Sequence, residues 1–288
     1  MNTMAKSATL HLLTFDLEEW FYIYSYQPHF NATVQWEQQT WRAGPIIERL
    51  LGVLAKYKAT ATFFCMGEFA RKYPDLIKCI AAAGHEIGAH SDQHQYARFQ
   101  DMQLFEADLM QNISTLKSLT NKTILSYRTP AYSVDTLQSK YQTILAQQGI
   151  LFDSSMKAGF FSVVGKLPNQ PFSIGQQSER YFFPVSTFKY LSKWPYGGSG
   201  FFRLMPQWLM NQQLNRPGYH MLYFHPRDFD PAMYHLPKQP WLRWKYGMGT
   251  KAMFGRLESM LQRYPMYSIE KGMQTPAFQQ LVLTRLIA

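Results

Sequence analysis

Two histidines, His90 and His94, stand four residues apart at the end of a short apolar run. One turn of helix would bring both imidazoles onto the same face. Two imidazole nitrogens aimed at one point make two of the three protein ligands of an open, catalytic type of zinc site, which then lacks only a carboxylate. Because such a pair also arises by chance in many chains, the spacing alone leaves a purely structural role open.

Three acidic residues, Asp16, Glu18 and Glu19, follow the apolar stretch formed by residues 9–15. That stretch is typical of a buried strand in a parallel sheet. If the chain stays extended past the strand, Asp16 and Glu18 point to the same side and Glu19 points away, so the first two can converge on one spot. The alternative is an acidic turn in solvent.

Apolar runs alternate with helical patterns along the chain, which favours parallel β/α units over a sandwich or a helix bundle. The predicted strands are residues 9–15, 59–66, 85–90, 123–127, 150–152 and 219–224, and the predicted helices are residues 45–57, 74–84, 101–119 and 134–148. Polar residues follow the strands at their carboxyl ends, where α/β folds carry their sites. Asp16, His90, Arg128 and Asp153 are therefore expected to be neighbours in space.

The segments between these elements carry weaker signals. Residues 20–44 hold aromatic and polar residues without a clear period, which predicts a long loop at the same end of the sheet. The glycine-rich residues 197–200 lack the Gly-Lys-Ser/Thr of a phosphate loop, which favours a tight turn lining a pocket. Cys65 and Cys79 both sit in apolar patterns and are expected to be buried thiols.

The composition narrows the function classes. The 288 residues are 46% hydrophobic, enough to bury a large core, and no repeat or linker divides them. Residues 189–271 hold 12 Lys/Arg against 4 Asp/Glu, which predicts phosphate groups or anionic lipid as partners, while no motif supports nucleic acid. No apolar run has the length of a signal peptide or membrane span, which predicts a cytoplasmic protein. The basic, aromatic residues 241–264 leave peripheral membrane contact open.

Five motifs, in order, resemble those of the polysaccharide deacetylases of the NodB-homology group, carbohydrate esterase family 4. They are Thr-Phe-Asp16, His90-Ser-Asp-Gln-His94, Arg128-Thr-Pro-Ala-Tyr132, Asp153-Ser-Ser and Leu222-Tyr-Phe-His225. The resemblance spans about residues 12–231 and implies an α/β fold, a distorted (β/α) barrel holding a divalent metal at the carboxyl ends of its strands. We expect one domain over residues 1–288, with a core at about 9–231 and a basic, aromatic extension at about 232–288.

The resemblance also implies a metal site. The family usually opens with two adjacent aspartates, base then ligand, whereas Leu17 follows Asp16 here. Asp16 would then be the general base, and Glu18 would join His90 and His94 as ligands of one divalent ion, with Glu19 as its rival. Zinc suits this ligand set, and nickel, cobalt or iron(II) would fit it too.

The remaining motifs imply the other roles. Arg128 would orient the Asp16 carboxylate, and His225 would protonate the leaving amine with Asp153 as its carboxylate partner. A backbone N–H in the Ala131–Tyr132 stretch would bind the oxyanion. Each role has a structural alternative, namely an ion pair for Arg128, a cap for Asp153 and a core position for His225.

The implied activity is metal-dependent removal of an N-acetyl group from a sugar unit of a bacterial surface polysaccharide or its precursor. The substrate would be a polymer, nucleotide-linked or lipid-linked, and Arg203 is expected to contact it. The segments ending at Arg203 and Pro231 further resemble a subgroup found with exopolysaccharide and O-antigen gene sets. The alternatives are a deacetylase or deformylase of an undecaprenyl-phosphate-linked sugar on the inner face of the membrane, and an inactive carbohydrate-binding protein. The sequence leaves the sugar, the acyl group and the oligomeric state open.

Overall fold

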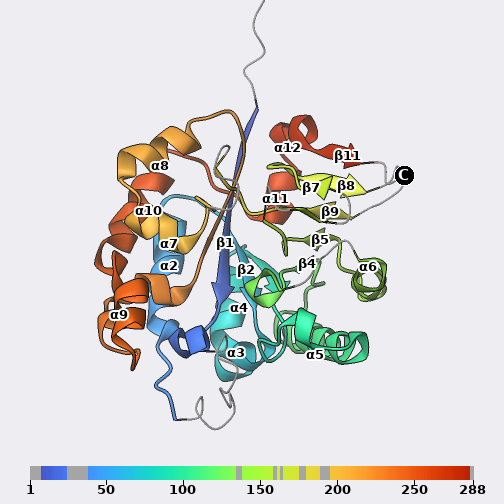
Figure 1. The fold of residues 1–288 in the computed structure, drawn as a ribbon, viewed down its shortest axis with the longest axis horizontal. Helices are drawn as coiled ribbons and strands as arrows, with labels where there is room; N and C mark the ends of the chain where they lie inside the picture. The colour runs from blue at the N-terminus through green and yellow to red at the C-terminus, as the bar shows by residue number, and fades with distance from the viewer. Residues whose placement is uncertain are drawn as a thin grey trace, which may run out of the picture.

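The computed structural model describes residues 8–24, 38–133, 138–157, 161–162, 165–174, 180–188 and 195–285. A curled sheet forms its centre, with the strand order β10-β1-β2-β3-β4-β5-β9-β8-β11 (Figure 1). Neighbouring strands are parallel except β8 and β9, and β6 and β7 form a separate hairpin-like pair. The strands are β1 Thr9–Leu17, β2 Thr62–Cys65, β3 Glu86–Ala89, β4 Ser126–Tyr127, β5 Phe152–Asp153, β6 Phe161–Ser162, β7 Gly165–Lys166, β8 Phe172–Ile174, β9 Tyr181–Phe182, β10 Gly218–Phe224 and β11 Leu283–Arg285.

Strand β1 is buried along nearly its whole length, since every residue after its first is buried. Burial on both faces explains why its sequence is a continuous apolar run rather than an alternating one. Its register places Phe15 beside Phe224 of β10 and Phe63 of β2. The polar residues that follow, Asp16 on one strand and His225 on the next, therefore reach the same edge of the sheet.

Helices flank the sheet, with α7 to α10 gathered on one side of β1 and α5 and α6 on the other (Figure 1). They are α2 Ala43–Lys56, α3 Gly67–Lys72, α4 Pro74–Ala82, α5 Met102–Thr120, α6 Ser139–Gln147, α7 Ser199–Leu204, α8 Gln207–Leu214, α9 Pro240–Gly247, α10 Met253–Leu261, α11 Ile269–Met273 and α12 Pro276–Leu281. Local signals set several ends: Pro74 opens α4, Gly84 follows its end with a φ of 80°, and the Asp101 carboxylate accepts the Leu104 N–H to cap α5.

The C-terminal residues belong to the same body of the protein. The backbone of Tyr267 exchanges hydrogen bonds with His11 and Leu13 of β1, and β11 pairs with β8. The residues after Pro231 therefore extend and cover the sheet. Within the described ranges, no helix combines the length and apolar character needed to cross a membrane.

Several predictions of local structure need correction. Cys65 is buried as expected, but Cys79 is exposed on the outer face of α4. The predicted strand 123–127 shortens to β4, because only its last two residues pair within the sheet. The predicted loop at 20–44 begins with a 3-10 turn, Trp20–Tyr24, and ends where α2 starts at Ala43. The described residues leave out the middle of this predicted loop, residues 25–37. They also leave out the start of the predicted helix 134–148 and the beginning of the basic stretch at Lys189.

Candidate active site

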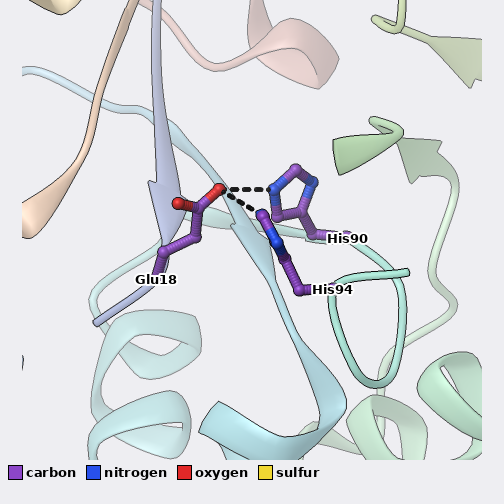
Figure 2. Close-up of side chains that lie close together, drawn as sticks. All are labelled: Glu18, His90 and His94. Carbon is purple, nitrogen blue, oxygen red and sulfur yellow. Dashed lines mark hydrogen bonds and ion pairs between the residues drawn. The ribbon is translucent and has the colours of Figure 1, made fainter. Parts of the chain in front are cut away.

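Three side chains meet at the carboxyl edge of the sheet: Glu18 just past β1, His90 just past β3, and His94 in the loop that follows (Figure 2). Glu18 Oε1 lies 2.9 Å from His94 Nε2 and 3.1 Å from His90 Nε2. All three residues are more than nine-tenths buried, and their ligand atoms lie within 4.8 Å of one another. Two imidazoles and a carboxylate form the donor set of many catalytic zinc sites, so these residues fit a divalent cation.

The backbone that presents the two histidines is a loop and not the turn of helix that their spacing predicted. Ser91 and His94 adopt left-handed φ angles of 67° and 58°, a conformation that costs roughly 1–2 kcal/mol in a residue with a Cβ atom. The Asp108 carboxylate offsets this cost, because its two oxygens accept the N–H groups of Asp92 and Gln93. The loop, rather than helical periodicity, aims both rings at Glu18.

His90 is fixed at both its ring and its backbone. Its Nδ1–H donates to the Arg128 carbonyl oxygen at 2.7 Å, which leaves Nε2 to face Glu18. Its backbone N–H donates to Asn112 Oδ1 at 2.8 Å, and Asn112 Nδ2 donates in turn to the Cys65 carbonyl oxygen. Asn112 was not predicted as part of the site. The sequence does contain a signal for it, because Asn112 is a polar residue on the inner face of the predicted helix 101–119.

The pKa shifts favour the metal-binding forms of His94 and Glu18, whereas metal binding at His90 would displace a proton that its surroundings favour. Burial lowers the pKa of His94, so its ring is neutral at pH 7 and has a lone pair to offer. Burial acts against the charged forms of His90 and Glu18 too, but the Glu18 and Asp16 carboxylates raise the pKa of His90. His94 and Arg227 hold the pKa of Glu18 well below its usual range. Glu18 is therefore an ionised carboxylate, the form that coordinates a cation.

The structure distinguishes Glu18 from Glu19, the other candidate for the carboxylate ligand. Glu19 turns away from the histidines, as the alternation of an extended strand predicts, and its Oε1 accepts the N–H groups of Arg42 and Ala43 at 2.8 Å each. It thereby caps the amino end of α2. Glu18 Oε2 instead contacts Arg227 Nη1 at 2.5 Å. Arg227 is a further residue that the sequence did not single out.

Asp16 lies beside this cluster and is held by Arg128. The fully buried Arg128 guanidinium donates from Nη1 to Asp16 Oδ1 at 2.7 Å and from Nη2 to Ser154 Oγ at 2.8 Å. The other oxygen of Asp16, Oδ2, lies 3.9 Å from His225 Nε2. Asp16, Glu18 and His225 also form a possible ligand group, but the bond from Arg128 to Asp16 makes the group with two histidines the better match.

The carboxylate that partners His225 is Asp228, and the prediction that Asp153 does so is wrong. Asp228 Oδ2 accepts the His225 backbone N–H at 2.7 Å and lies 3.2 Å from its ring Nδ1. Pro226 starts a short 3-10 helix, and its single turn brings Asp228, three residues after His225, back against the histidine. The Asp153 carboxylate accepts the Ser155 N–H, and its Oδ2 finds no hydrogen-bond partner within the described part of the chain.

Family models match two stretches of the chain. Residues 38–150 match the family model described as polysaccharide deacetylase, and residues 156–274 match a domain of unknown function (DUF3473). The chain contains a polysaccharide deacetylase domain. His90, His94 and Arg128 lie in the first matched stretch and His225 lies in the second, while Asp16 and Glu18 precede both.

Curated relatives match part of the chain. The peptidoglycan deacetylase of Helicobacter pylori is 28% identical over 116 residues, 40% of this chain and 39% of its own length. A peptidoglycan-N-acetylglucosamine deacetylase of Bacillus cereus is 30% identical over 102 residues, 34% of this chain and 48% of its own length. The chain thus spans less than half of the length of these relatives.

A solved structure matches the fold over the whole chain. The crystal structure of a proposed polysaccharide deacetylase from Mycobacterium smegmatis has a TM-score of 0.65 at 18% identity, covering 100% of this chain and 96% of that one. The predicted distorted (β/α) barrel is therefore confirmed.

A cavity of about 380 Å³ opens beside the cluster of Glu18, His90 and His94, and it also reaches Asp16 and His225. Ala131 and Tyr132 line it as well, and both have left-handed φ angles, 56° and 55°. Two successive strained residues beside a candidate site are the kind of feature that a tightly held catalytic turn shows. The Tyr132 N–H donates to the Thr129 carbonyl oxygen at 3.3 Å, so the backbone at Ala131 is the better candidate for the predicted oxyanion contact.

Arg203 lines the same cavity, but its guanidinium binds other groups of the protein. It donates to the carbonyl oxygens of Lys245, Tyr246 and Met248, and its Nε lies 3.4 Å from Asp228 Oδ1. The predicted contact with substrate is therefore replaced by a supporting role, because Arg203 anchors both the cavity wall and the carboxylate behind His225.

We expect Asp228→Asn to lower kcat by about 10²–10⁴-fold, because the amide no longer fixes the orientation and tautomer of the His225 ring. Asp153→Asn is the matched control and should lower kcat much less. Acetate release measured for both variants checks this. An equal or larger loss in Asp153→Asn would restore Asp153 as the partner.

The Asp153 carboxyl predicts a pH dependence of stability. Burial raises its pKa from 3.8 to about 6, so the folded state favours the protonated form. Stability is fully present below pH 4 and falls as the pH rises through 6, by about 3 kcal/mol for this group. Asp153→Asn removes that loss. The free energy of unfolding of the variant, relative to the wild type, should therefore rise from pH 4 to pH 7 in urea titrations, and a constant difference would contradict the buried, ionisable state.

Proposed function

We propose that the protein is a metal-dependent hydrolase that removes the N-acetyl group from a sugar unit of a bacterial surface polysaccharide or its precursor. One observation carries this proposal: Glu18, His90 and His94 converge beside an Arg128-held Asp16, and His225 faces the same spot. The proposed ligand Glu18, base Asp16 and acid His225 thus line one cavity, which is large enough for a sugar.

Glu18, His90 and His94 would hold the cation, with zinc the best match to the donor set. When bound, the cation would lower the pKa of a water and polarise the acetamide carbonyl. Arg227 and the Arg128 carbonyl oxygen would keep Glu18 and His90 in their binding orientations through the contacts at 2.5 and 2.7 Å.

Asp16 would act as general base through Oδ2, the oxygen that Arg128 does not bind. It takes the proton of the attacking water as that water adds to the acetamide carbon. His225 then gives a proton from Nε2 to the sugar nitrogen as the carbon–nitrogen bond breaks, which yields acetate and a free amine. Asp228 would stabilise the protonated ring throughout.

The name of the Bacillus cereus relative refers to peptidoglycan N-acetylglucosamine, which supports an N-acetylated sugar as the substrate class. The segments ending at Arg203 and Pro231 resemble a subgroup of the family that is found with exopolysaccharide and O-antigen gene sets, and this resemblance supports a surface glycan as the destination of the sugar. A lipid-linked sugar is the second candidate, favoured by the exposed tryptophans near the cavity mouth.

The test is to incubate the zinc-loaded protein with N-acetylglucosamine oligomers and with peptidoglycan fragments, and to measure acetate and new amines together. We expect equal amounts of both, and none with His90→Ala. Oligomer binding without acetate release would instead identify an inactive carbohydrate-binding protein. Release from lipid-linked sugars alone would select the second candidate.

A further inference from the structure

Helix α9 carries large apolar side chains on the outside of the protein. Trp241 and Trp244, three residues apart, are 58% and 66% exposed, and Leu204 at the end of α7 is 49% exposed. The α9 helix itself lies at the outer edge of the molecule (Figure 1). On an ordinary surface exposed apolar residues are scattered singly, so two exposed tryptophans on one short helix indicate an interaction site. We call Leu204, Trp241, Trp244 and Lys245 the α9 patch.

The stretch of sequence that contains α9 carries positive charge only. Residues 231–257 contain five Lys/Arg and no Asp/Glu. The two acids that precede this stretch, Asp228 and Asp230, are buried and paired with Arg203 and Arg42. The Lys245 ammonium group lies over the Trp241 ring, 5.8 Å from its centre. Indole rings are therefore interleaved with cations at the surface itself.

The α9 patch continues into the mouth of the substrate cavity. Leu204, Trp244 and Lys245 line the same cavity that reaches Asp16 and Glu18. The bonds from Arg203 to the carbonyl oxygens of residues 245, 246 and 248 fix the end of α9 against α7. A surface bound to the α9 patch would hence stand at the entrance to the site.

We propose that the α9 patch docks the protein on an anionic lipid bilayer. Tryptophan is enriched at the boundary between headgroups and acyl chains, and Lys/Arg beside it bind anionic headgroups, so the two features together match a bilayer surface. A neutral glycan would use the indole rings but gives no role to the cations, and a nucleic acid would use the cations but leaves Leu204 exposed. Resting on the proposed function, this placement makes a lipid-anchored N-acetyl sugar the substrate class.

The test is flotation of the full chain with vesicles of phosphatidylcholine, with and without phosphatidylglycerol. We expect binding to the mixed vesicles only, weakened by salt, with a blue shift of tryptophan fluorescence. Trp241→Ala/Trp244→Ala should weaken binding by more than about tenfold, since both indoles leave the interface. Lys238 and Lys251 are exposed lysines of residues 231–257 outside the cavity lining, and Lys238→Gln and Lys251→Gln should each weaken binding about fivefold.

Two controls separate this proposal from the catalytic one. Phe99→Ala removes a side chain that is 76% exposed on a different element and should bind vesicles as the wild type does. Glu18→Gln should also bind normally, so loss of hydrolysis and loss of docking are distinguishable. Absence of vesicle binding at low salt would overturn the proposal, as would equal binding by the double tryptophan variant. Fluorescence changes with soluble oligosaccharide alone would reassign the α9 patch to glycan binding.

Discussion

Asp16→Asn is expected to lower kcat by about 10²–10⁴-fold while the protein keeps its full complement of metal. The amide still accepts the hydrogen bond from Arg128 Nη1, seen at 2.7 Å to Asp16 Oδ1, but it can no longer take a proton from water. The size of the loss is that of a general base in other enzymes. The measurement is acetate release at saturating substrate, with metal content determined on the same samples.

Glu19→Gln is the matched control for Asp16→Asn. Glu19 is equally buried and only three residues away, but its carboxylate caps α2. This variant should retain kcat to within a few-fold. If Asp16→Asn kept more than about a tenth of wild-type kcat, Asp16 would not be the base.

Arg128→Met is expected to lower the free energy of unfolding by about 3–5 kcal/mol, the usual cost of breaking a buried ion pair from one side. Arg128 is fully buried, with its guanidinium 4.2 Å from the centre of the Phe64 ring. Its removal leaves the Asp16 carboxylate charged and without its cation, and leaves Thr14 and Ser154 without their donor. Urea denaturation followed by circular dichroism measures the change.

Lys56→Met provides the comparison for Arg128→Met, because it breaks the exposed pair with Glu258 and should change stability little. Arg128→Lys keeps one charge but lacks the fork that reaches Asp16 and Ser154 together, so it should recover only part of the loss. Equal stabilities for all three variants would show that the buried network does not stabilise the fold.

Sequence periodicity predicted the parts of the site that depend on strand geometry. The apolar run of β1 placed Asp16 and Glu18 on one side and Glu19 on the other, since side chains alternate along an extended chain. The order of strands and helices placed His90 and Arg128 at the same edge. The first feature follows from one strand, and the second follows from the parallel order of the strands.

The contacts that sequence reasoning missed or misassigned depend on loops and on residues far apart in the chain. His90 and His94 meet through left-handed loop positions that a helical pattern cannot foretell. Asp228 partners His225 because a proline-started turn folds back over three residues. Arg227 reaches Glu18 across 209 positions, and Arg203 reaches the end of α9 instead of the substrate. Only packing decides such pairs.

Zinc binding by the Glu18, His90 and His94 cluster can be measured by competition with a chelator of known affinity, comparing the wild type with Glu18→Gln and Glu19→Gln. We predict one zinc ion per wild-type chain. Glu18→Gln should bind it more than about 100-fold more weakly, a larger loss than an outer-shell partner gives, and Glu19→Gln should bind it as the wild type does. Unchanged zinc affinity in Glu18→Gln, or a wild-type chain that takes up no divalent metal, would contradict the proposed site.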